Sequence, residues 1–371
     1  MKMKTGKIFC LLITIAILTT GCANKLPFMP SGTEEGKEIA GVTSQTPVTM
    51  EPEKEAVETE VPETLSPTPT PSKEPEPFTF NPHVHCDMIS EVCPEETWES
   101  FYHLCDAIRA GEDSFECASE EAYKWCTDDV TLGSFMPAAC TFVIGDGYEN
   151  GVGKIKYEMD KDKFLEREKK FEEEICKMLN EAIRSDYSDF EKVMGLYAYV
   201  CQYFQYDFEP IDGMDNEQFG NYACLMHKNG ICCEIAGSFN YLLLQSGVQS
   251  MPFGTDAEHD WNYVLVDGKG YHVDATWVLH GEFPNGPLDL QYFMQTEEER
   301  INDGFKKSDF QAEQIWYWKS DGDISGFTAT DTKFAPLHDG SMYAGMDTER
   351  NVIKYTSPEG ELLELDYSDL E

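Results

Sequence analysis

The sequence predicts a fold that combines helices with antiparallel β-hairpins. Apolar residues recur at three- and four-residue spacing over 96–111, 162–185 and 189–204, which is the period of an amphipathic helix. Strand-like segments on either side of Asp267-Gly268 are typical of a hairpin with a two-residue turn. A second hairpin is predicted near the C-terminus, around the turn Pro358-Glu359-Gly360.

Residues 1–21 are predicted to be a lipoprotein signal peptide. Three lysines precede an apolar run from Ile8 to Leu18, which is too short to cross a hydrocarbon core of about 30 Å. The segment Leu18-Thr19-Thr20-Gly21-Cys22 resembles a bacterial lipoprotein signal, although Thr19 replaces the usual aliphatic residue. We therefore expect export and a lipid anchor at Cys22 on the outer face of the cell membrane. An ordinary secretory signal or a retained anchor stays open.

Residues 22–77 are predicted to form a disordered tether rich in Pro, Glu and Thr. Between Met29 and Pro77 there are nine prolines, eleven glutamates and no aromatic residue. Such a segment cannot bury enough apolar area to offset the entropy lost on ordering. It would hold the folded part away from the membrane.

The folded part is expected to begin near Phe78 and to have three regions. The first, 78–185, is mainly helical, and the next two are a catalytic core over 186–325 and a C-terminal β-hairpin extension over 326–371. Within the first region, in addition to the two helices named above, the residue pattern predicts a strand at 114–117, a helix at 119–126 and a strand at 154–159.

The charge excludes some classes of protein. The chain has 69 acidic and 28 basic residues, which gives a formal net charge of −41. Nucleic-acid binding is not expected, because phosphate contacts require clustered Lys and Arg. The same charge opposes binding to anionic lipids, so membrane attachment is expected through the N-terminal lipid only.

The thirteen cysteines permit two interpretations. Ten remain when Cys10, Cys22 and Cys232 are set aside, and an even number in an exported protein favours disulfides. Several of the ten lie at helical core positions, where a cysteine acts as a small apolar residue. Whether disulfides form therefore stays open. No C-x-x-C pair occurs, so a zinc ribbon is not expected, and the sequence predicts no cofactor and no metal.

Cys232, His259 and Asp274 lie within 45 residues and are of types that cooperate in catalysis. Cys232 begins a predicted helix, where the positive end of the helix dipole favours a thiolate. With Asp267-Gly268 as the turn, the strand register places His259 and Asp274 as diagonal neighbours on one face, about 7–8 Å apart. Cys232 would then be the nucleophile, His259 the base and acid, and Asp274 the group that orients the imidazole.

Three motifs, in order, are Gly230-Ile231-Cys232-x-x-x-Ala236, His259-x-Trp261-Asn262 and Val273-Asp274-Ala275-Thr276-Trp277. They resemble the core of the transglutaminase-like superfamily, a group of papain-like cysteine enzymes. The resemblance covers about residues 186–300. It implies an α+β fold in which the nucleophile helix packs on an antiparallel sheet bearing the His and the Asp. It also implies chemistry on peptide or side-chain amides through a thioester.

Two departures from the family pattern concern charge near the nucleophile. Glu234 lies in the segment after Cys232, where the family commonly has Gly-Tyr-Ala, and Asp260 replaces the small residue that usually follows the histidine. Acids near a thiolate oppose its ionisation, so activity would be weak or tuned to a cationic substrate such as a lysine amine. The neighbouring Cys233 also leaves the nucleophile ambiguous, and the motif favours Cys232.

Other residues are weaker candidates. The predicted lining of the substrate cleft is Trp261, Trp277, His272 and Cys233. Core packing is an equally good explanation for Trp277. His83 and His85 with Cys86 could bind a metal, but such a cluster at the start of a domain is more often incidental.

Two classes of function follow. The leading hypothesis is a cell-surface cysteine enzyme that hydrolyses, or transfers the acyl group of, amides in a peptide or protein substrate, with the cell wall as one setting. The alternative is a surface-anchored binding or structural lipoprotein that keeps the fold with little or no turnover. A solute-binding lipoprotein is a third hypothesis, in which the triad would be a coincidence.

Overall fold

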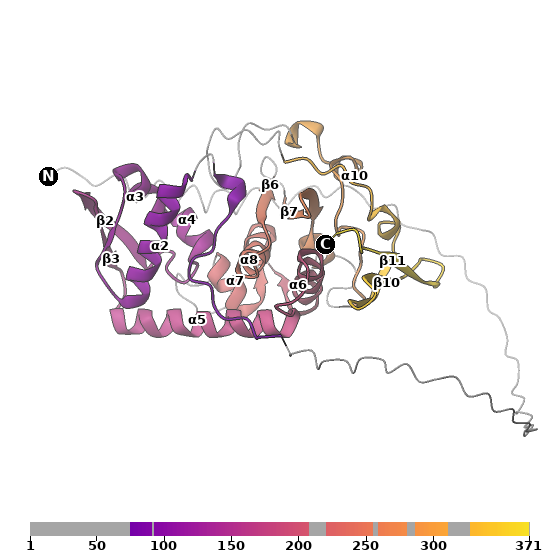
Figure 1. Ribbon diagram of the computed structural model, residues 1–371, viewed down its shortest axis with the longest axis horizontal. Coiled ribbons are helices and arrows are strands. Elements are labelled where there is room, and N and C mark those ends of the chain that lie inside the picture. The colour runs from indigo at the N-terminus through magenta and orange to yellow at the C-terminus, as the bar shows by residue number, and fades with distance from the viewer. Residues whose placement is uncertain are drawn as a thin grey trace, which may run out of the picture. The chain divides into compact units, whose positions relative to one another are not determined.

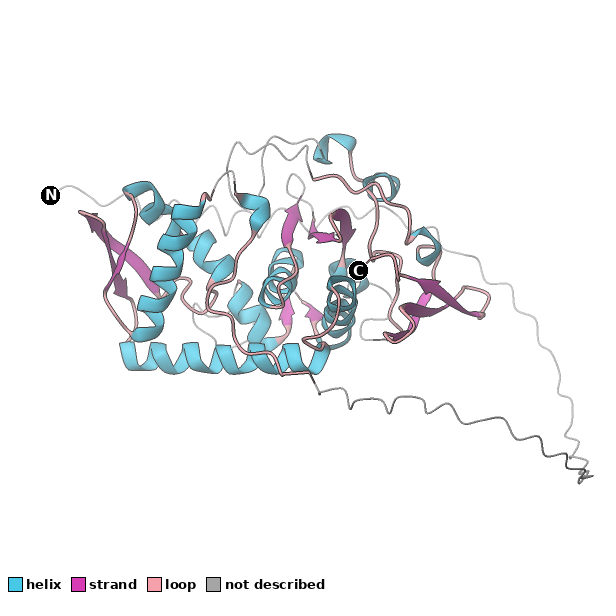
Figure 2. Cartoon of the chain, in the orientation of Figure 1, coloured by secondary structure: helices cyan, strands magenta, loops and turns pink. Residues whose placement is uncertain are grey.

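The computed structural model describes residues 75–90, 93–207, 220–254, 259–279, 286–310 and 327–370 (Figures 1 and 2). The predicted signal peptide and nearly all of the tether lie outside these residues and stay predictions. The chain contacts the folded body from Glu76 onward, where the Ser185 hydroxyl donates to the Glu76 carbonyl at 2.6 Å. Asn180 bonds both the N–H and the C=O of Phe78, at 2.8 and 3.0 Å.

A helical layer with a small antiparallel sheet comes first. α2 (Glu95–Ala110) ends at Gly111, whose left-handed φ of 70° stops the helix. α3 (Glu120–Cys126) and α4 (Asp129–Phe135) begin after Ser119 and Asp128, whose side chains cap backbone N–H groups. The strands β1 (Ser114–Glu116), β2 (Val143–Glu149) and β3 (Val152–Tyr157) pair in the order β1-β3-β2. The pattern located α2, β1, α3 and β3 to within two residues and missed α4 and β2.

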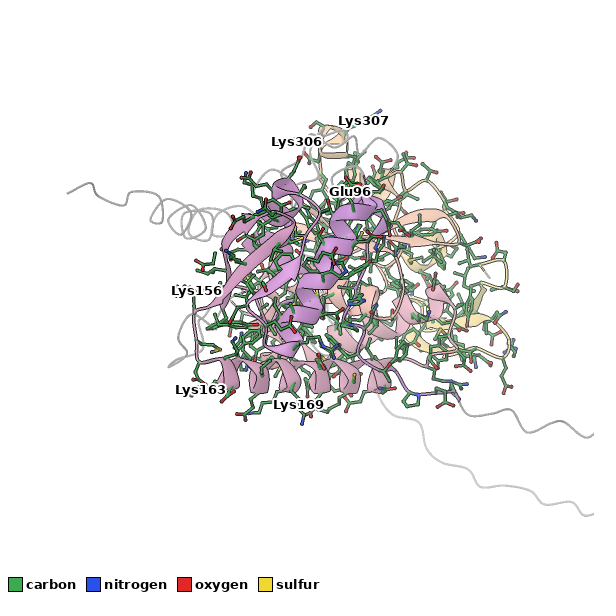
Figure 3. The ribbon with its side chains drawn as sticks, turned by 60° about the vertical axis from the view of Figure 1, so that its left-hand side comes forward. Glu96, Lys156, Lys163, Lys169, Lys306 and Lys307 are labelled. Atoms are coloured by element: carbon green, nitrogen blue, oxygen red, sulfur yellow. The ribbon has the colours of Figure 1, made fainter. Side chains whose placement is uncertain are left out.

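α5 (Lys161–Ala182) is the long charged helix expected from the sequence. Its inner face buries Phe164, Phe171, Ile175, Met178 and Leu179, which recur at helical spacing. Figure 3 shows Lys163 and Lys169 along its outer side. The helix packs against α6 and α7, so its apolar face, more than its surface ion pairs, holds it in place.

α6 (Asp189–Tyr203) leads into the part of the fold that carries the site. It starts with a capping box, since the Glu191 N–H donates to the Ser188 hydroxyl at 3.3 Å and the Ser188 N–H donates to the Glu191 carboxylate at 2.8 Å. β4 (Gln205–Tyr206) and β5 (Asn229–Gly230) form a short parallel pair on either side of α7 (Asn221–His227) in the sequence. The buried α8 (Cys232–Gln245) follows β5 directly and packs on α6 and α7.

An antiparallel sheet in the order β6-β7-β8 lies against α8. Its strands are β6 (Ser250–Gly254), β7 (Asp260–Val266) and β8 (Lys269–Val273). Asp267 and Gly268 form the β7–β8 turn with φ of 48° and 68°, so both are left-handed, as a type I′ turn requires. The ladder runs from Val266 opposite Lys269 to Asn262 opposite Val273, which confirms the predicted register.

The predicted second strand of this hairpin is wrong beyond Val273. β8 ends there, and Ala275–Leu279 is the short helix α9. The reason is Asp274, whose carboxylate accepts a hydrogen bond from the backbone N–H of Trp277 three residues later, as an N-cap does. Asp274 therefore reaches His259 from a helix start and not from a paired strand position.

Among the last described segments, Phe305 packs on Trp261 and Phe310 packs on Phe253 of the sheet. α10 (Glu297–Asn302) and the 3₁₀ turns η2 (Lys307–Phe310) and η4 (Ala335–Leu337) precede a sheet of β9 (Met342–Asp347), β10 (Val352–Thr356) and β11 (Leu362–Asp366). The predicted C-terminal hairpin is β10–β11, and β9 was missed. One buried apolar cluster of the described residues extends from Val84 to Leu370, and a second, smaller one includes Phe253, Trp261 and Phe310. The region boundaries drawn from the sequence stay predictions.

Helices and mainly antiparallel sheets make this an α+β protein. α8 packs on the β6 and β7 strands of the antiparallel sheet, and α9 contacts α6, α8 and β7. Within the described residues, no helix is both long enough and apolar enough to cross a bilayer.

Candidate active site

Cys232 is the first residue of α8 and is 6% exposed. The helix start is fixed by Glu234, whose two carboxylate oxygens accept hydrogen bonds from the backbone N–H groups of Ile231 at 3.0 Å and Gly220 at 2.8 Å. Burial raises the pKa of Glu234, and these hydrogen bonds partly offset the effect. The acid that departs from the family pattern thus caps the helix that bears the cysteine.

α8 and β7 run in the same direction, so their first residues lie at the same end of the α8–β7 pair. The chain turns back at Gly247, β6 packs along α8, and β7 is antiparallel to β6, so β7 runs in the direction of α8. The Asn262 amide donates to the Ala236 carbonyl at 2.9 Å and fixes the alignment. Cys232 lies one helical turn before Ala236, and His259 lies three residues before Asn262. Both residues therefore lie at the same end of the α8–β7 pair.

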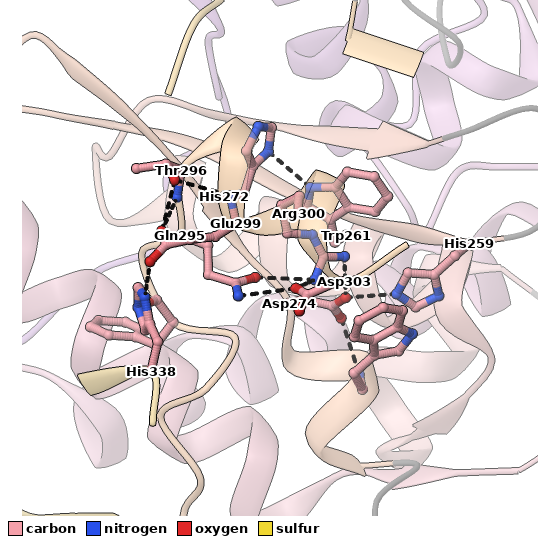
Figure 4. Close-up of polar contacts among 12 residues, drawn as sticks. His259, Trp261, His272, Asp274, Gln295, Thr296, Glu299, Arg300, Asp303 and His338 are labelled. Carbon is pink, nitrogen blue, oxygen red and sulfur yellow. Dashed lines mark hydrogen bonds and ion pairs between the residues drawn. The ribbon is translucent and has the colours of Figure 1, made fainter. Parts of the chain in front are cut away.

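His259 and Asp274 are joined by a hydrogen bond (Figure 4). His259 Nε2 lies 2.7 Å from Asp274 Oδ2, and the two side chains are 10% and 1% exposed. Since a carboxylate only accepts, Nε2 carries a proton, and Nδ1 is the nitrogen that can gain or lose one. In this tautomer the ring nitrogen that does not face Asp274 is the one that can accept a proton.

Asp274 has three hydrogen-bond donors around its carboxylate. Oδ1 accepts from the Trp277 N–H at 3.0 Å, and Oδ2 accepts from His259 and from Arg300 Nη2 at 2.8 Å. Burial raises the pKa of Asp274, but the charges of His259 and Arg300 together with the hydrogen bonds outweigh it, and the pKa is held below its usual range. The carboxylate is therefore both ionised and fixed in orientation.

Aromatic rings enclose the pair. His259 stacks on Trp277 with ring centroids 5.2 Å apart, and on Trp261 and Phe305 at 5.8 and 6.1 Å. The Arg300 guanidinium lies within 4.4–4.6 Å of the centroids of the rings of Trp261, Trp277 and Phe305. Excluding water in this way strengthens the electrostatic interaction between His259 and Asp274.

Two of the four predicted cleft residues are buried. Trp261 donates from Nε1 to His272 Nδ1 at 2.9 Å, and their rings are 0% and 1% exposed. Burial lowers the pKa of His272 well below its usual range, and the charge of Arg300 lowers it further, so this ring is neutral. Trp277 and Cys233 are half-buried. A role of these four residues in a substrate cleft stays a prediction.

No motif or spacing in the sequence singles out Arg300, Gln295, Asp303 or Phe305. Arg300 Nη1 donates to Gln295 Oε1 at 3.2 Å and lies 3.6 Å from Asp303 Oδ2. The sequence does contain a signal for the helix that carries Arg300, because Thr296-x-x-Glu299 is a capping box and predicts a short helix. Arg300 is the basic residue in the last turn of that helix. Only the packing of α10 brings that residue to Asp274.

His83 and His85, which the sequence offers as a weak metal-binding candidate with Cys86, are hydrogen-bonded to side chains of α2. His83 Nε2 lies 2.9 Å from Asp106 Oδ1, and His85 Nδ1 lies 2.6 Å from the Tyr102 hydroxyl. Among the described residues no group of three or more His, Cys, Asp or Glu side chains is arranged to hold a metal ion. The same residues contain no cysteine pair joined as a disulfide.

Comparisons with known proteins give distant similarities. No protein-family model matches the chain. A stretch of 115 residues, 27% of the chain, is 24% identical to kyphoscoliosis peptidase of Mus musculus and of Homo sapiens, and it spans 17% of the length of those proteins. A solved structure described as "a Putative Cysteine Protease from Cytophaga hutchinsonii" matches with a TM-score of 0.22 and 13% identity, over 37% of this chain and 62% of that chain.

Proposed function

We propose that this protein is a transglutaminase-like cysteine enzyme that acts on peptide or side-chain amides through Cys232, His259 and Asp274. The observation that carries the proposal is the buried 2.7 Å bond between His259 and Asp274, at the end of the sheet where α8 begins with Cys232. The similarity to proteins named as a peptidase supports a cysteine enzyme of this general kind.

The reaction follows from the roles of the three groups. The Cys232 thiolate attacks the amide carbonyl carbon, and the backbone N–H of Cys232 at the helix start stabilises the oxyanion. The C–N bond then breaks, the leaving amine takes a proton from the His259 imidazolium, and a thioester remains on Cys232. Asp274 holds the ring throughout and stabilises its charged form.

The second half of the reaction regenerates the thiolate. His259 takes a proton from water or from an incoming amine, which attacks the thioester carbonyl and releases Cys232. Water gives a carboxylic acid and therefore hydrolysis, whereas a lysine amine gives an isopeptide bond and therefore acyl transfer. The acidic chain favours a cationic amine as the second substrate.

The test is turnover by the purified folded part on a fluorogenic peptide-amide library, with and without a primary-amine acceptor. We expect release of the amine in the wild type and its loss in Cys232→Ala and in His259→Ala. Cys176→Ala is the matched control, because Cys176 lies on α5 and outside the proposed site, and Cys233→Ala tests whether the neighbouring thiol takes part. Product analysis by mass spectrometry separates hydrolysis from transfer. Undiminished turnover in Cys232→Ala contradicts the proposal.

A second candidate function is a surface-anchored binding lipoprotein of the same fold. The 6% exposure of Cys232 favours it, since a nucleophile must meet its substrate. Binding of a peptide by a wild-type protein that turns over no amide, and binds equally well as Cys232→Ala, would support this candidate.

The cellular setting is a separate proposal. We infer from Leu18-Thr19-Thr20-Gly21-Cys22 that the exported protein carries its lipid on Cys22. Metabolic labelling with an alkyne fatty acid should mark the full chain expressed in a bacterium with lipoprotein processing. Cys22→Ser should abolish the label and release the protein from membranes, whereas Cys10→Ser should change neither.

A further inference from the structure

Arg300 is an unusual residue to find in the interior of this protein. In a chain with a formal net charge of −41, its guanidinium is 0% exposed and lies among three aromatic rings. A buried ion pair adds little net stability over an apolar group of the same shape, because both charges are desolvated. Fold stability alone therefore does not account for a cation at this position.

Arg300 is hydrogen-bonded to Asp274, one of the three proposed catalytic residues. Nη2 donates to Asp274 Oδ2 at 2.8 Å, and this is the oxygen that His259 also bonds, at 2.7 Å (Figure 4). One carboxylate oxygen therefore serves a permanent cation and a ring that becomes a cation during the reaction. The negative charge of Asp274 favours imidazolium, and the positive charge of Arg300 opposes it.

We propose that Arg300 is a positioning residue for the Cys232–His259–Asp274 reaction, which fixes Asp274 and sets the alkaline limit of activity. This inference rests on the function proposed above. The resting thiolate–imidazolium pair is active until the imidazolium loses its proton. Arg300 makes that loss easier, so the active range ends at a lower pH, and the imidazolium more readily gives its proton to the leaving amine.

Several other titratable groups lie on the elements around His259 and Asp274. They are neutral or acidic, unlike Arg300. Burial raises the pKa of Tyr197, Cys201 and Tyr292 and lowers that of His272, so these four are neutral at neutral pH. The groups on the neighbouring elements are Tyr197 and Cys201 of α6, Cys232 and Glu234 of α8, Asp260 of β7, His272 of β8, Tyr292, and Asp303 after α10. None of the groups in this list is a permanent cation, whereas Arg300 is one.

Two substitutions of Arg300 test its positive charge and its planar shape separately. Its planar group donates to Asp274 and Gln295 at once, which a lysine ammonium on a shorter reach does not reproduce. Arg300→Met keeps an apolar stem among the rings and removes the charge. Arg300→Lys keeps the charge and removes the planar fork. The two variants therefore report on different parts of the proposal.

The experiment is the pH profile of kcat/KM and of kcat for wild type, Arg300→Met and Arg300→Lys on the amide cleaved best by the wild type. We expect Arg300→Met to move the alkaline limb to higher pH by about one unit, equivalent to a tenfold change in proton affinity. Arg300→Lys should keep the wild-type limb while kcat falls. Arg350→Met is the matched control, because Arg350 is exposed and pairs with Glu364 at the protein surface.

Each result distinguishes the inference from the proposed function. An active wild type with an unchanged alkaline limb in Arg300→Met assigns Arg300 a structural role only and overturns the inference. If Arg300→Met does not fold, Asp303→Asn is measured instead. Removing this anion beside Arg300 should move the limb to lower pH, and an unmoved limb overturns the inference. Absence of turnover in the wild type overturns the proposed function itself.

Discussion

The Glu299 carboxylate accepts a hydrogen bond from His338 Nδ1 at 2.7 Å, while His338 Nε2 donates to the Phe293 carbonyl at 2.7 Å. Both partners are acceptors, so both ring nitrogens carry a proton while the two bonds persist. Burial raises the pKa of Glu299, but hydrogen bonds from His338 and Thr296 outweigh it and hold the pKa at about 2. This pair ties η4 to α10, the helix that carries Arg300.

His338→Gln should therefore weaken the attachment of the C-terminal segments. We expect a loss of about 1–3 kcal/mol in the free energy of unfolding at pH 6, because buried Glu299 loses its charged donor. Because its folded pKa is depressed, Glu299 contributes stability that is complete above pH 4.5 and is lost as the pH falls toward about 2. That acid-dependent loss should be smaller in the variant.

Urea unfolding from pH 2 to 7 measures both effects. The matched control is His103→Gln, since the exposed His103 ring bonds the Glu116 carbonyl at the surface. Equal unfolding free energies for His338→Gln and wild type at pH 6 would show that the pair does not hold η4 in place.

Glu168 should give the protein a stability that falls with rising pH. Burial raises its pKa from 4.5 to about 8, with a smaller contribution from Glu172, and its Oε2 has no hydrogen-bond partner among the described residues. A carboxyl whose folded pKa is raised contributes stability that is complete below pH 4.5 and is lost as the pH rises through about 8. Glu168→Gln should flatten the unfolding free energy between these limits, as followed by urea titration.

Glu166→Gln is the control for this prediction, since Glu166 lies on the outer face of the same helix and pairs with Lys170. It should leave the pH dependence unchanged. The same slope in Glu168→Gln as in wild type would mean that Glu168 is ionised within the fold at neutral pH.

Asp274→Asn should damage both activity and stability. Activity should fall roughly 10²–10⁴-fold, because the amide cannot hold His259 in the same tautomer. Stability should fall by about 3–5 kcal/mol, because the buried Arg300 loses its charged partner. In the double variant Asp274→Asn/Arg300→Met, much of that stability should return while activity stays low.

Thermal or urea unfolding of the four proteins in this cycle measures the coupling between the two residues. Asp331→Asn serves as the control, because Asp331 pairs with Lys269 in a more exposed position. Additive losses in the double variant would contradict the described ion pair.

Local chemistry explains what the sequence could predict. Asp267-Gly268 predicts the β7–β8 register, because two residues with left-handed φ form a type I′ turn and this turn places Val266 opposite Lys269. Strand-forming residues in Val273-Asp274-Ala275-Thr276-Trp277 predict a strand, but the Asp274 carboxylate caps the Trp277 N–H and the segment forms α9. β6 was not predicted. It contains Pro252, and it is an edge strand, where proline is tolerated.

The rest of the site depends on tertiary packing. Arg300 is 26 residues from Asp274 and reaches it only because α10 is held between β8 and η4. No periodicity or spacing in the sequence reports such a contact. The charge balance around His259 could therefore be assigned only from the structure, while the three proposed catalytic residues could be proposed from their motifs.

The most direct test of the account is the alkylation rate of each cysteine by iodoacetamide at pH 6.5, followed by peptide mapping with mass spectrometry. A thiolate reacts and a thiol does not, so Cys232 should be modified faster than Cys233 and far faster than the buried Cys224. The rate at Cys232 should fall at least tenfold in His259→Ala. A Cys232 that reacts no faster than Cys224, or equally fast without His259, would contradict the proposed catalytic pair.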